Sequence, residues 1–141
     1  MILLDTNVVS EPLKLTGDAG VLTWIDAQMI ETLYLSTISL AELRFGIAAL
    51  APGKRRDTLH SSLEQRILPL FVGRILPFDA AASEAYAVLR ARARAQGIAI
   101  APSDGYIAAT ASSHGLIVAT RDIGPFEAVG LTVINPWNTQ H

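Results

Sequence analysis

The first thirteen residues, MILLDTNVVSEPL (Met1–Leu13), join a short apolar segment to an acidic residue. The apolar run Ile2–Leu4 predicts a strand buried on both faces, as strands inside a parallel sheet are. Asp5 follows this strand directly, and Thr6 is placed to cap a turn of helix after it. Because carboxylates are rarely buried without a partner, this position indicates a functional role for Asp5.

The rest of the chain alternates short apolar segments with longer amphipathic ones. Further strands are expected at Tyr34–Ser36, Arg74–Pro77, Leu116–Ala119 and Leu131–Ile134. Helices are expected at Asp18–Met29, Ser39–Leu50, Lys54–Val72, Ala80–Gln96 and Ser103–His114. This alternation predicts an α/β fold in which helices flank a mainly parallel sheet. No internal repeat or linker divides the sequence, so we expect a single domain over residues 1–141.

The composition excludes several classes of protein. A net charge of −2 argues against a generally basic nucleic-acid-binding surface, so phosphate recognition must come from local arginines or metal ions. The absence of cysteine excludes disulfides and thiolate metal sites and fits the cytoplasm. No apolar run approaches the ~20 residues of a membrane span. A mean hydropathy of +0.36 predicts that some apolar surface faces another subunit or partner.

Four acidic residues are expected at one edge of the predicted sheet. In such a fold, ligands bind at the carboxyl ends of the strands, where loops meet the first turns of the next helices. Asp5 and Asp122 each follow a strand, whereas Glu42 and Asp104 each lie in the first turn of a predicted helix. Connectivity therefore places all four carboxylates at the same edge, without fixing the distances between them.

Three of these carboxylates also have a structural explanation when each is taken alone. Glu42 lies three residues after Ser39, the spacing of a capping box in which Glu42 accepts the backbone N–H of Ser39. Asp104 in a first helical turn complements the helix dipole. Asp122, which precedes Gly124-Pro125, fits an Asx turn.

The combination of the four favours a metal site. Two like charges about 4 Å apart repel by roughly 4 kcal/mol at an effective dielectric of 20, so clustered carboxylates either take up protons or bind hard cations. With oxygen ligands and no set of histidines, Mg²⁺ or Mn²⁺ fits best. Such an ion can generate a nucleophilic hydroxide and neutralise a phosphodiester in its transition state. This chemistry points to metal-dependent phosphodiester hydrolysis.

Four segments in this order, MILLDTNVVSE, SLAELRFGI, PSDGYIAATA and VATRD, resemble the PIN-domain family, and in particular the VapC-type toxin ribonucleases of bacterial toxin–antitoxin pairs. The resemblance runs from Met1 to Trp137. It implies a five-stranded parallel sheet in a PIN-like domain. It further implies an Mg²⁺-dependent endoribonuclease, the toxin of a type II toxin–antitoxin system, that hydrolyses phosphodiester bonds of RNA.

The resemblance also assigns roles to individual residues. It implies that the catalytic residues, which also bind Mg²⁺ or Mn²⁺, are Asp5, Glu42, Asp104 and Asp122. It implies that Asn7 and Thr120 orient these carboxylates, and we expect Thr6 to support the carboxylates in the same way as these two residues. Two arginines beside the acidic residues, Arg44 and Arg121, are candidates for contacting the substrate phosphates, and a solvated surface position is the alternative for each. The neighbouring arginines Arg90, Arg92 and Arg94 are interpreted mainly as a solvated face, with contact to RNA as the alternative.

The partners implied by the resemblance are a second copy of the chain and a cognate antitoxin whose helix covers the acidic cleft. The homodimer and antitoxin would form a higher assembly that reaches promoter DNA only through the antitoxin. We expect the partner groove and the dimer surface on the apolar faces of Ser39–Leu50 and Lys54–Val72. Two other functions compete: a non-catalytic PIN-like module that acts only in an antitoxin–promoter repressor complex, and a DNA nuclease with the same chemistry.

Overall fold

A computed structural model describes residues 1–138 of the chain. Its strands form one parallel sheet of five in the order β3-β2-β1-β4-β5. The strands are β1 (Ile2–Leu4), β2 (Leu33–Ser36), β3 (Ile75–Leu76), β4 (Ile117–Ala119) and β5 (Val133–Ile134). The expected α/β fold around a parallel five-stranded sheet is thereby confirmed.

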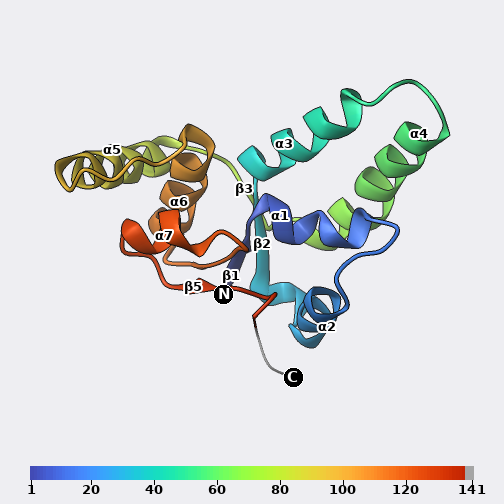
Figure 1. The fold of residues 1–141 in the computed structure, drawn as a ribbon, viewed down its shortest axis with the longest axis horizontal. Helices are drawn as coiled ribbons and strands as arrows, with labels where there is room; N and C mark the ends of the chain where they lie inside the picture. The colour runs from blue at the N-terminus through green and yellow to red at the C-terminus, as the bar shows by residue number, and fades with distance from the viewer. Residues whose placement is uncertain (139–141) are drawn as a thin grey trace.

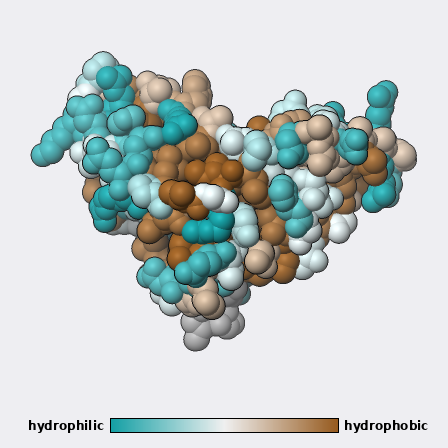
Figure 2. All heavy atoms as spheres, turned by 180° about the vertical axis from the view of Figure 1, so that it is seen from behind, coloured by the Kyte–Doolittle hydropathy of each residue, from teal (hydrophilic) through white to brown (hydrophobic). Residues whose placement is uncertain are grey.

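Helices flank the sheet on both sides. Within residues 1–138 the α-helices are α1 (Thr6–Val9), α2 (Ala19–Ala27), α3 (Thr37–Ala48), α4 (Lys54–Ser61), α5 (Ala80–Ala95), α6 (Pro102–His114) and α7 (Ile123–Ala128). Figure 1 shows α5, α6 and α7 on one side of the strands and α1 to α4 on the other. Figure 1 shows α5 and α6 projecting as one arm and α3 and α4 as the other, and Figure 2 shows the notch between the arms from behind.

Strand β1 lies in the middle of the sheet. Leu3 of β1 pairs with Tyr34 of β2 on one side and with Val118 of β4 on the other. The sheet grows from β1 toward β3 in one direction and toward β5 in the opposite direction. The carboxyl end of β1 is therefore the point where the strand order reverses, which is where sheets of this type bind ligands.

The side chains of β1 contribute to two separate hydrophobic clusters, because successive side chains of a strand point to opposite faces. Leu3 packs with Leu89 of α5 and Ile107 of α6. On the other face, Ile2 and Leu4 belong to the cluster that contains residues of α1, α2, α3 and β2. The end of β1 thus lies between two packed layers. None of the helices within residues 1–138 combines the length and apolar character needed to span a membrane.

The start of α3 corrects one expectation that bears on the site. The helix begins at Thr37, and the hydroxyl of Ser36 accepts the backbone N–H of Ser39 at 3.0 Å. The expected capping box between Ser39 and Glu42 is therefore wrong, since the donor is already paired. Glu42 consequently lies in the second turn of α3, and its side chain is available for another contact.

Other elements also differ from expectation. Asp5, rather than Thr6, caps α1, because its Oδ1 accepts the backbone N–H of Thr6. The helix expected over Lys54–Val72 consists of α4 followed by a π-helical segment and a 3₁₀ segment. Helix α7 was not expected, and Pro125 lies in its first turn, where a missing N–H is tolerated. The short helices are η1 (Glu11–Leu13), η2 (Ile30–Thr32), η3 (Ser62–Ile67) and η4 (Leu68–Phe71).

Candidate active site

Asp5 lies at the carboxyl end of β1, in the centre of the sheet. Its backbone N–H donates to the carbonyl oxygen of Ala119 at 2.9 Å, which continues the pairing of β1 with β4. The residue is only 6% exposed. Each carboxylate oxygen accepts one hydrogen bond of 2.8 Å, Oδ1 from the backbone N–H of Thr6 and Oδ2 from the hydroxyl of Thr120. The orientation of this buried carboxylate is therefore fixed on both sides.

Thr120 connects Asp5 to the loop after β4. Its buried hydroxyl accepts the backbone N–H of Asp122 at 3.0 Å and lies 3.4 Å from the side-chain nitrogen of Asn7. The side-chain oxygen of Asn7 accepts the backbone N–H of Arg121 at 3.3 Å. These contacts hold the loop that carries Asp122 against the beginning of α1. Asn7 and Thr120 thus lie where they can orient the acidic residues.

Thr6 connects Asp5 to Glu42 on α3. The Thr6 hydroxyl donates to Glu42 Oε1 at 2.6 Å and lies 3.0 Å from the hydroxyl of Ser39. Ser39 is buried on the same helix, one turn before Glu42. Ser39 was expected only to cap the helix, and its contact with Thr6 is a further role. The signal for it in the sequence is a small polar residue on the buried face of an amphipathic helix.

The four carboxylates influence one another electrostatically. Burial raises the pKa of Asp5 to about 6, and the negative charges of Asp104 and Glu42 add to this rise, whereas the hydrogen bonds from Thr120 and Thr6 oppose it. The pKa of Asp104 is also raised, first by burial and then by the charges of Asp122 and Glu42. No cation is among the groups that shift either pKa. The site therefore carries an excess of negative charge.

The chemistry of the four carboxylates fits a hard divalent cation, but their side chains do not converge on a single point in this structure. All four candidate ligands offer carboxylate oxygens, the ligands preferred by Mg²⁺ and Mn²⁺. Within residues 1–138, however, no three acidic or histidine side chains are close enough to hold a metal ion together. Glu42 and Asp122 are exposed, so rotation of their side chains is the movement by which the set could close.

The two candidate arginines have different surroundings. Arg44 forms a two-pronged ion pair with Glu64, with distances of 2.7 and 3.0 Å. The guanidinium of Arg121 lies 5.1 Å from the ring centre of Trp137, while its backbone N–H contacts Asn7. Arg44 is thus paired with Glu64 and not with any of the four candidate metal ligands. Arg121 directly precedes Asp122 in the chain.

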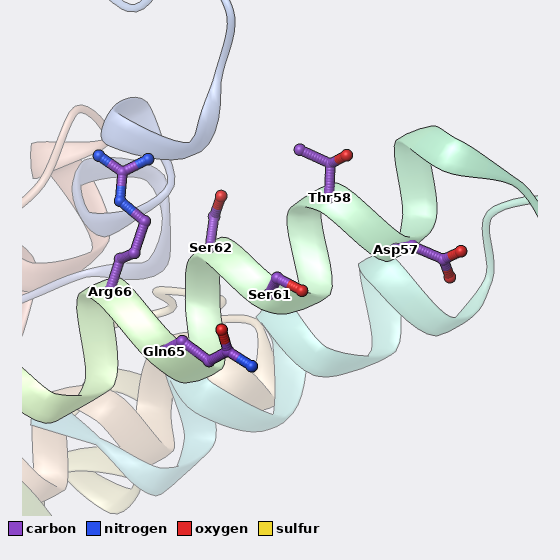
Figure 3. Close-up of a pocket in the computed structure, with 6 residues that line it drawn as sticks. All are labelled: Asp57, Thr58, Ser61, Ser62, Gln65 and Arg66. Atoms are coloured by element: carbon purple, nitrogen blue, oxygen red, sulfur yellow. The ribbon is translucent and has the colours of Figure 1, made fainter.

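Two hollows lie on the arm formed by α3, α4 and η3. A groove of about 600 Å³ between the helices is lined by Arg44, Ile47, Ala48, Arg56, Asp57, His60, Leu63 and Glu64. A second, shallow hollow of about 330 Å³ is lined by polar residues of α4 and η3 alone, as Figure 3 shows. Neither hollow includes any of the four carboxylates, so both lie apart from the acidic site.

Comparison with known proteins identifies the family. The PIN domain family matches residues 2–130. VapC ribonuclease Y4jK of Sinorhizobium fredii is 61% identical, covering 97% of this chain and 98% of the relative. Toxin FitB of Neisseria gonorrhoeae is 54% identical, covering 98% of this chain and 99% of the relative.

A solved structure of FitAB bound to an IR36 DNA fragment contains a chain with the same fold. The two chains superimpose with a TM-score of 0.95 at 52% identity, covering 100% of this chain and 99% of the other. Sequence and fold therefore agree over almost the whole length. The chain belongs to the PIN-domain family, and within it to the VapC and FitB ribonuclease toxins of toxin–antitoxin systems.

Proposed function

We propose that this protein is a metal-dependent endoribonuclease, the toxin of a type II toxin–antitoxin system, that hydrolyses phosphodiester bonds of RNA with Mg²⁺ or Mn²⁺. The observation that supports this most is the mutual repulsion of the carboxylates around Asp5. Burial and two neighbouring negative charges act on Asp5, and no nearby cation relieves them. A protein that only binds a partner has no need of such a repulsive cluster at the carboxyl edge of its sheet.

Asp5 and Asp104 would hold the metal, with Glu42 and Asp122 completing the set. The chemistry gained with a divalent cation at these carboxylates would be activation of water and neutralisation of charge on the phosphodiester. The chain's own residues prepare this site: Thr120 and Thr6 fix the two oxygens of Asp5. The Thr6 hydroxyl also holds Glu42 beside α1. Through these contacts β1 and α3 would present Asp5 and Glu42 to the same ligand.

The direct test is cleavage of a labelled single-stranded RNA with Mg²⁺, with Mn²⁺ and with a chelator. Asp104→Asn removes one ligand charge and is expected to lower kcat/KM by at least ~100-fold. Asp26→Asn, an exposed carboxylate on α2, is the matched control and should leave the rate unchanged. A folded Asp104→Asn variant that cleaves as fast as the wild type would refute the proposal. A DNA strand of the same sequence tests whether the enzyme requires RNA.

The proposed partners are a second copy of the chain and a cognate antitoxin. The assembly would bind promoter DNA only through the antitoxin. The groove between α3 and α4 has apolar side chains, Ile47 and Leu63, among charged ones, a composition that suits an amphipathic helix. Phe45 on α3 is 74% exposed and adds apolar surface to the same arm. With RNA as its substrate, the toxin would act in the cytoplasm. Light scattering that shows a monomer unable to take up the antitoxin would contradict this assembly.

A non-catalytic binding module within a repressor complex is the second candidate. It is favoured by one observation, the lack of three metal-binding side chains in contact among residues 1–138. Titration with Mg²⁺ and Mn²⁺ separates the two functions. A module of this kind would show neither a shift in melting temperature with the ions nor cleavage of RNA, whereas the nuclease should show both.

A further inference from the structure

We propose that Arg90 binds a phosphate of the RNA strand next to the one that is cleaved, and that Tyr86 positions Arg90 for this contact. The inference rests on the proposed function and deepens it, because it assigns a substrate-binding residue to the arm opposite Glu42. It concerns a cluster on α5 and α6 that the candidate active site does not include.

Arg90 is held in place by aromatic side chains. Tyr86 and Arg90 lie four residues apart on α5 and therefore share one face of the helix. Arg90 Nη1 donates to the hydroxyl of Tyr86 at 2.6 Å, and the guanidinium carbon lies 5.4 Å from the centre of the tyrosine ring. Tyr86 stacks on Tyr106 with ring centres 4.8 Å apart, and Phe78 packs edge-on against both rings. The guanidinium is thus already ordered, so its binding to a ligand costs little additional side-chain entropy.

This cluster lies against the turn of α6 that carries Asp104. A Cβ atom on Gly105 would be 3.0 Å from Tyr86 Cε2 and 3.7 Å from Arg90 Cδ. Gly105 is the residue directly after Asp104, so the absence of a side chain there lets Tyr86 and Arg90 pack against the helical turn that carries Asp104. Tyr106, which supports Tyr86, follows in the same turn. The position of Arg90 relative to Asp104 is therefore set by direct packing between α5 and α6.

The positive charge of Arg90 has no carboxylate partner among residues 1–138. The ion pairs found there join Lys14 to Glu11 and Arg44 to Glu64. A guanidinium has five N–H donors, and the Tyr86 hydroxyl uses one of them. Arg90 is thus a positioned cation with donors to spare, packed against the turn of α6 that carries Asp104, in a protein whose net charge is negative.

An RNA strand provides the matching anion. It carries a phosphate at every nucleotide, so a strand with one phosphate at the carboxylates has further phosphates on either side. The guanidinium binds phosphate oxygens through paired N–H donors, which fixes orientation as well as adding affinity. Contacts of this kind set the register of the strand without reading its bases. Arg90 would therefore place the scissile bond and leave sequence choice to other residues.

The test measures RNA binding in a chelator and RNA cleavage with Mg²⁺, each over a series of salt concentrations. The variants are Arg90→Gln, Arg90→Lys and the control Arg92→Gln, whose exposed arginine lies on a different face of α5. Arg90→Gln should weaken binding and raise KM by about 10-fold, with a smaller change in kcat. Loss of one phosphate contact should also reduce the slope of log K against log salt by about 0.7.

The other variants decide whether the effect comes from a specific phosphate contact. Arg90→Lys keeps the charge and should restore the salt slope while recovering only part of the affinity, and it serves as the main comparison if Arg90→Gln is unstable. Equal behaviour of Arg90→Gln and Arg92→Gln would overturn the proposal. So would a loss of affinity with an unchanged salt slope, which is the result of a purely structural role. A wild type that binds RNA through Arg90 without cleaving it would instead refute the proposed nuclease function.

Discussion

The hydroxyl of Thr120, at the end of β4, donates a 2.8 Å hydrogen bond to Asp5 Oδ2, at the end of β1. Both residues are buried, and they come from neighbouring strands of the sheet. The same hydroxyl accepts the backbone N–H of Asp122. A single neutral group thus links the central carboxylate to the loop that carries another acidic residue. Its contribution can be measured separately from the charge of the carboxylates.

Thr120→Val should weaken catalysis by removing this hydrogen bond with little change in shape. The hydrogen bond holds the pKa of Asp5 down, so its loss should move the acid limb of the kcat/KM profile to higher pH. We expect the free energy of unfolding at pH 8 to fall by about 1–3 kcal/mol, the usual cost of losing a hydrogen bond to a buried charge. Thr120→Ser retains the hydroxyl and should behave like the wild type in both measurements. An unchanged pH profile for the valine variant would contradict the role assigned to Thr120.

The raised pKa of Asp5 predicts a stability that falls as pH rises. The folded protein binds the proton of Asp5 more tightly than the unfolded chain does, since the pKa is about 6 against 3.8. Without metal, the contribution of Asp5 to the free energy of unfolding should therefore be greatest below about pH 4. It should decline by up to about 3 kcal/mol as the pH passes through 6.

Asp5→Asn should remove most of this decline, because the amide does not ionise. At pH 8 the metal-free variant is expected to be more stable than the metal-free wild type, although it should be inactive. Chemical denaturation at pH 5 and pH 8 measures both effects. Asp26→Asn on the surface of α2 is the control. If the wild type and Asp5→Asn show the same pH dependence, Asp5 is not the group responsible.

Divalent ions should reverse the pH trend of the wild type. A metal that binds only the folded state stabilises it by RT ln(1 + [L]/Kd), about 2.7 kcal/mol at a hundred times Kd. Because the metal requires ionised Asp5, the rise in melting temperature with Mg²⁺ or Mn²⁺ should be larger at pH 8 than at pH 5. Asp104→Asn should lose most of the shift. Equal shifts at the two pH values would argue that the ions bind elsewhere.

Two glycine substitutions should change stability in opposite directions. A Cβ on Gly17 would lie 2.7 Å from the backbone oxygen of Glu11, which cannot rotate away, so Gly17→Ala should cost about 1–3 kcal/mol. Gly46 lies inside α3, and a Cβ there meets no atom within 4 Å. Gly46→Ala should therefore gain about 0.5–1 kcal/mol from helix propensity. Urea unfolding of both variants measures the difference, and a stabilising Gly17→Ala would show that the loop after η1 is differently packed.

The sequence was informative where a residue's position follows from periodicity and chain connectivity. The apolar run before Asp5 predicted a buried strand, and β1 occupies the centre of the sheet as such a strand should. Alternation of strands with helices predicted the parallel sheet and, through it, a shared edge for the carboxylates. These inferences need only the local pattern and the rule that parallel strands end at the same edge.

The sequence was uninformative where contacts join residues far apart in the chain. Glu42 has the spacing of a capping box, and only the structure shows that Ser36 caps the helix and that Thr6 holds Glu42. The ion pair of Arg44 with Glu64 spans 20 residues and has no local signal. Helix α7 was missed because the pair Gly124-Pro125 usually marks a turn. In each case a tertiary contact or an alternative cap decided between two locally reasonable patterns.

The arrangement of the strands has a consequence for synthesis of the protein. Asp5 leaves the ribosome 115 residues before Thr120, which directly follows β4 and whose hydroxyl orients Asp5. Any activity that needs the complete acidic set can begin only after translation has passed Asp122 and β4 has paired with β1. A nascent chain, or a fragment released by early termination, therefore holds an incomplete centre.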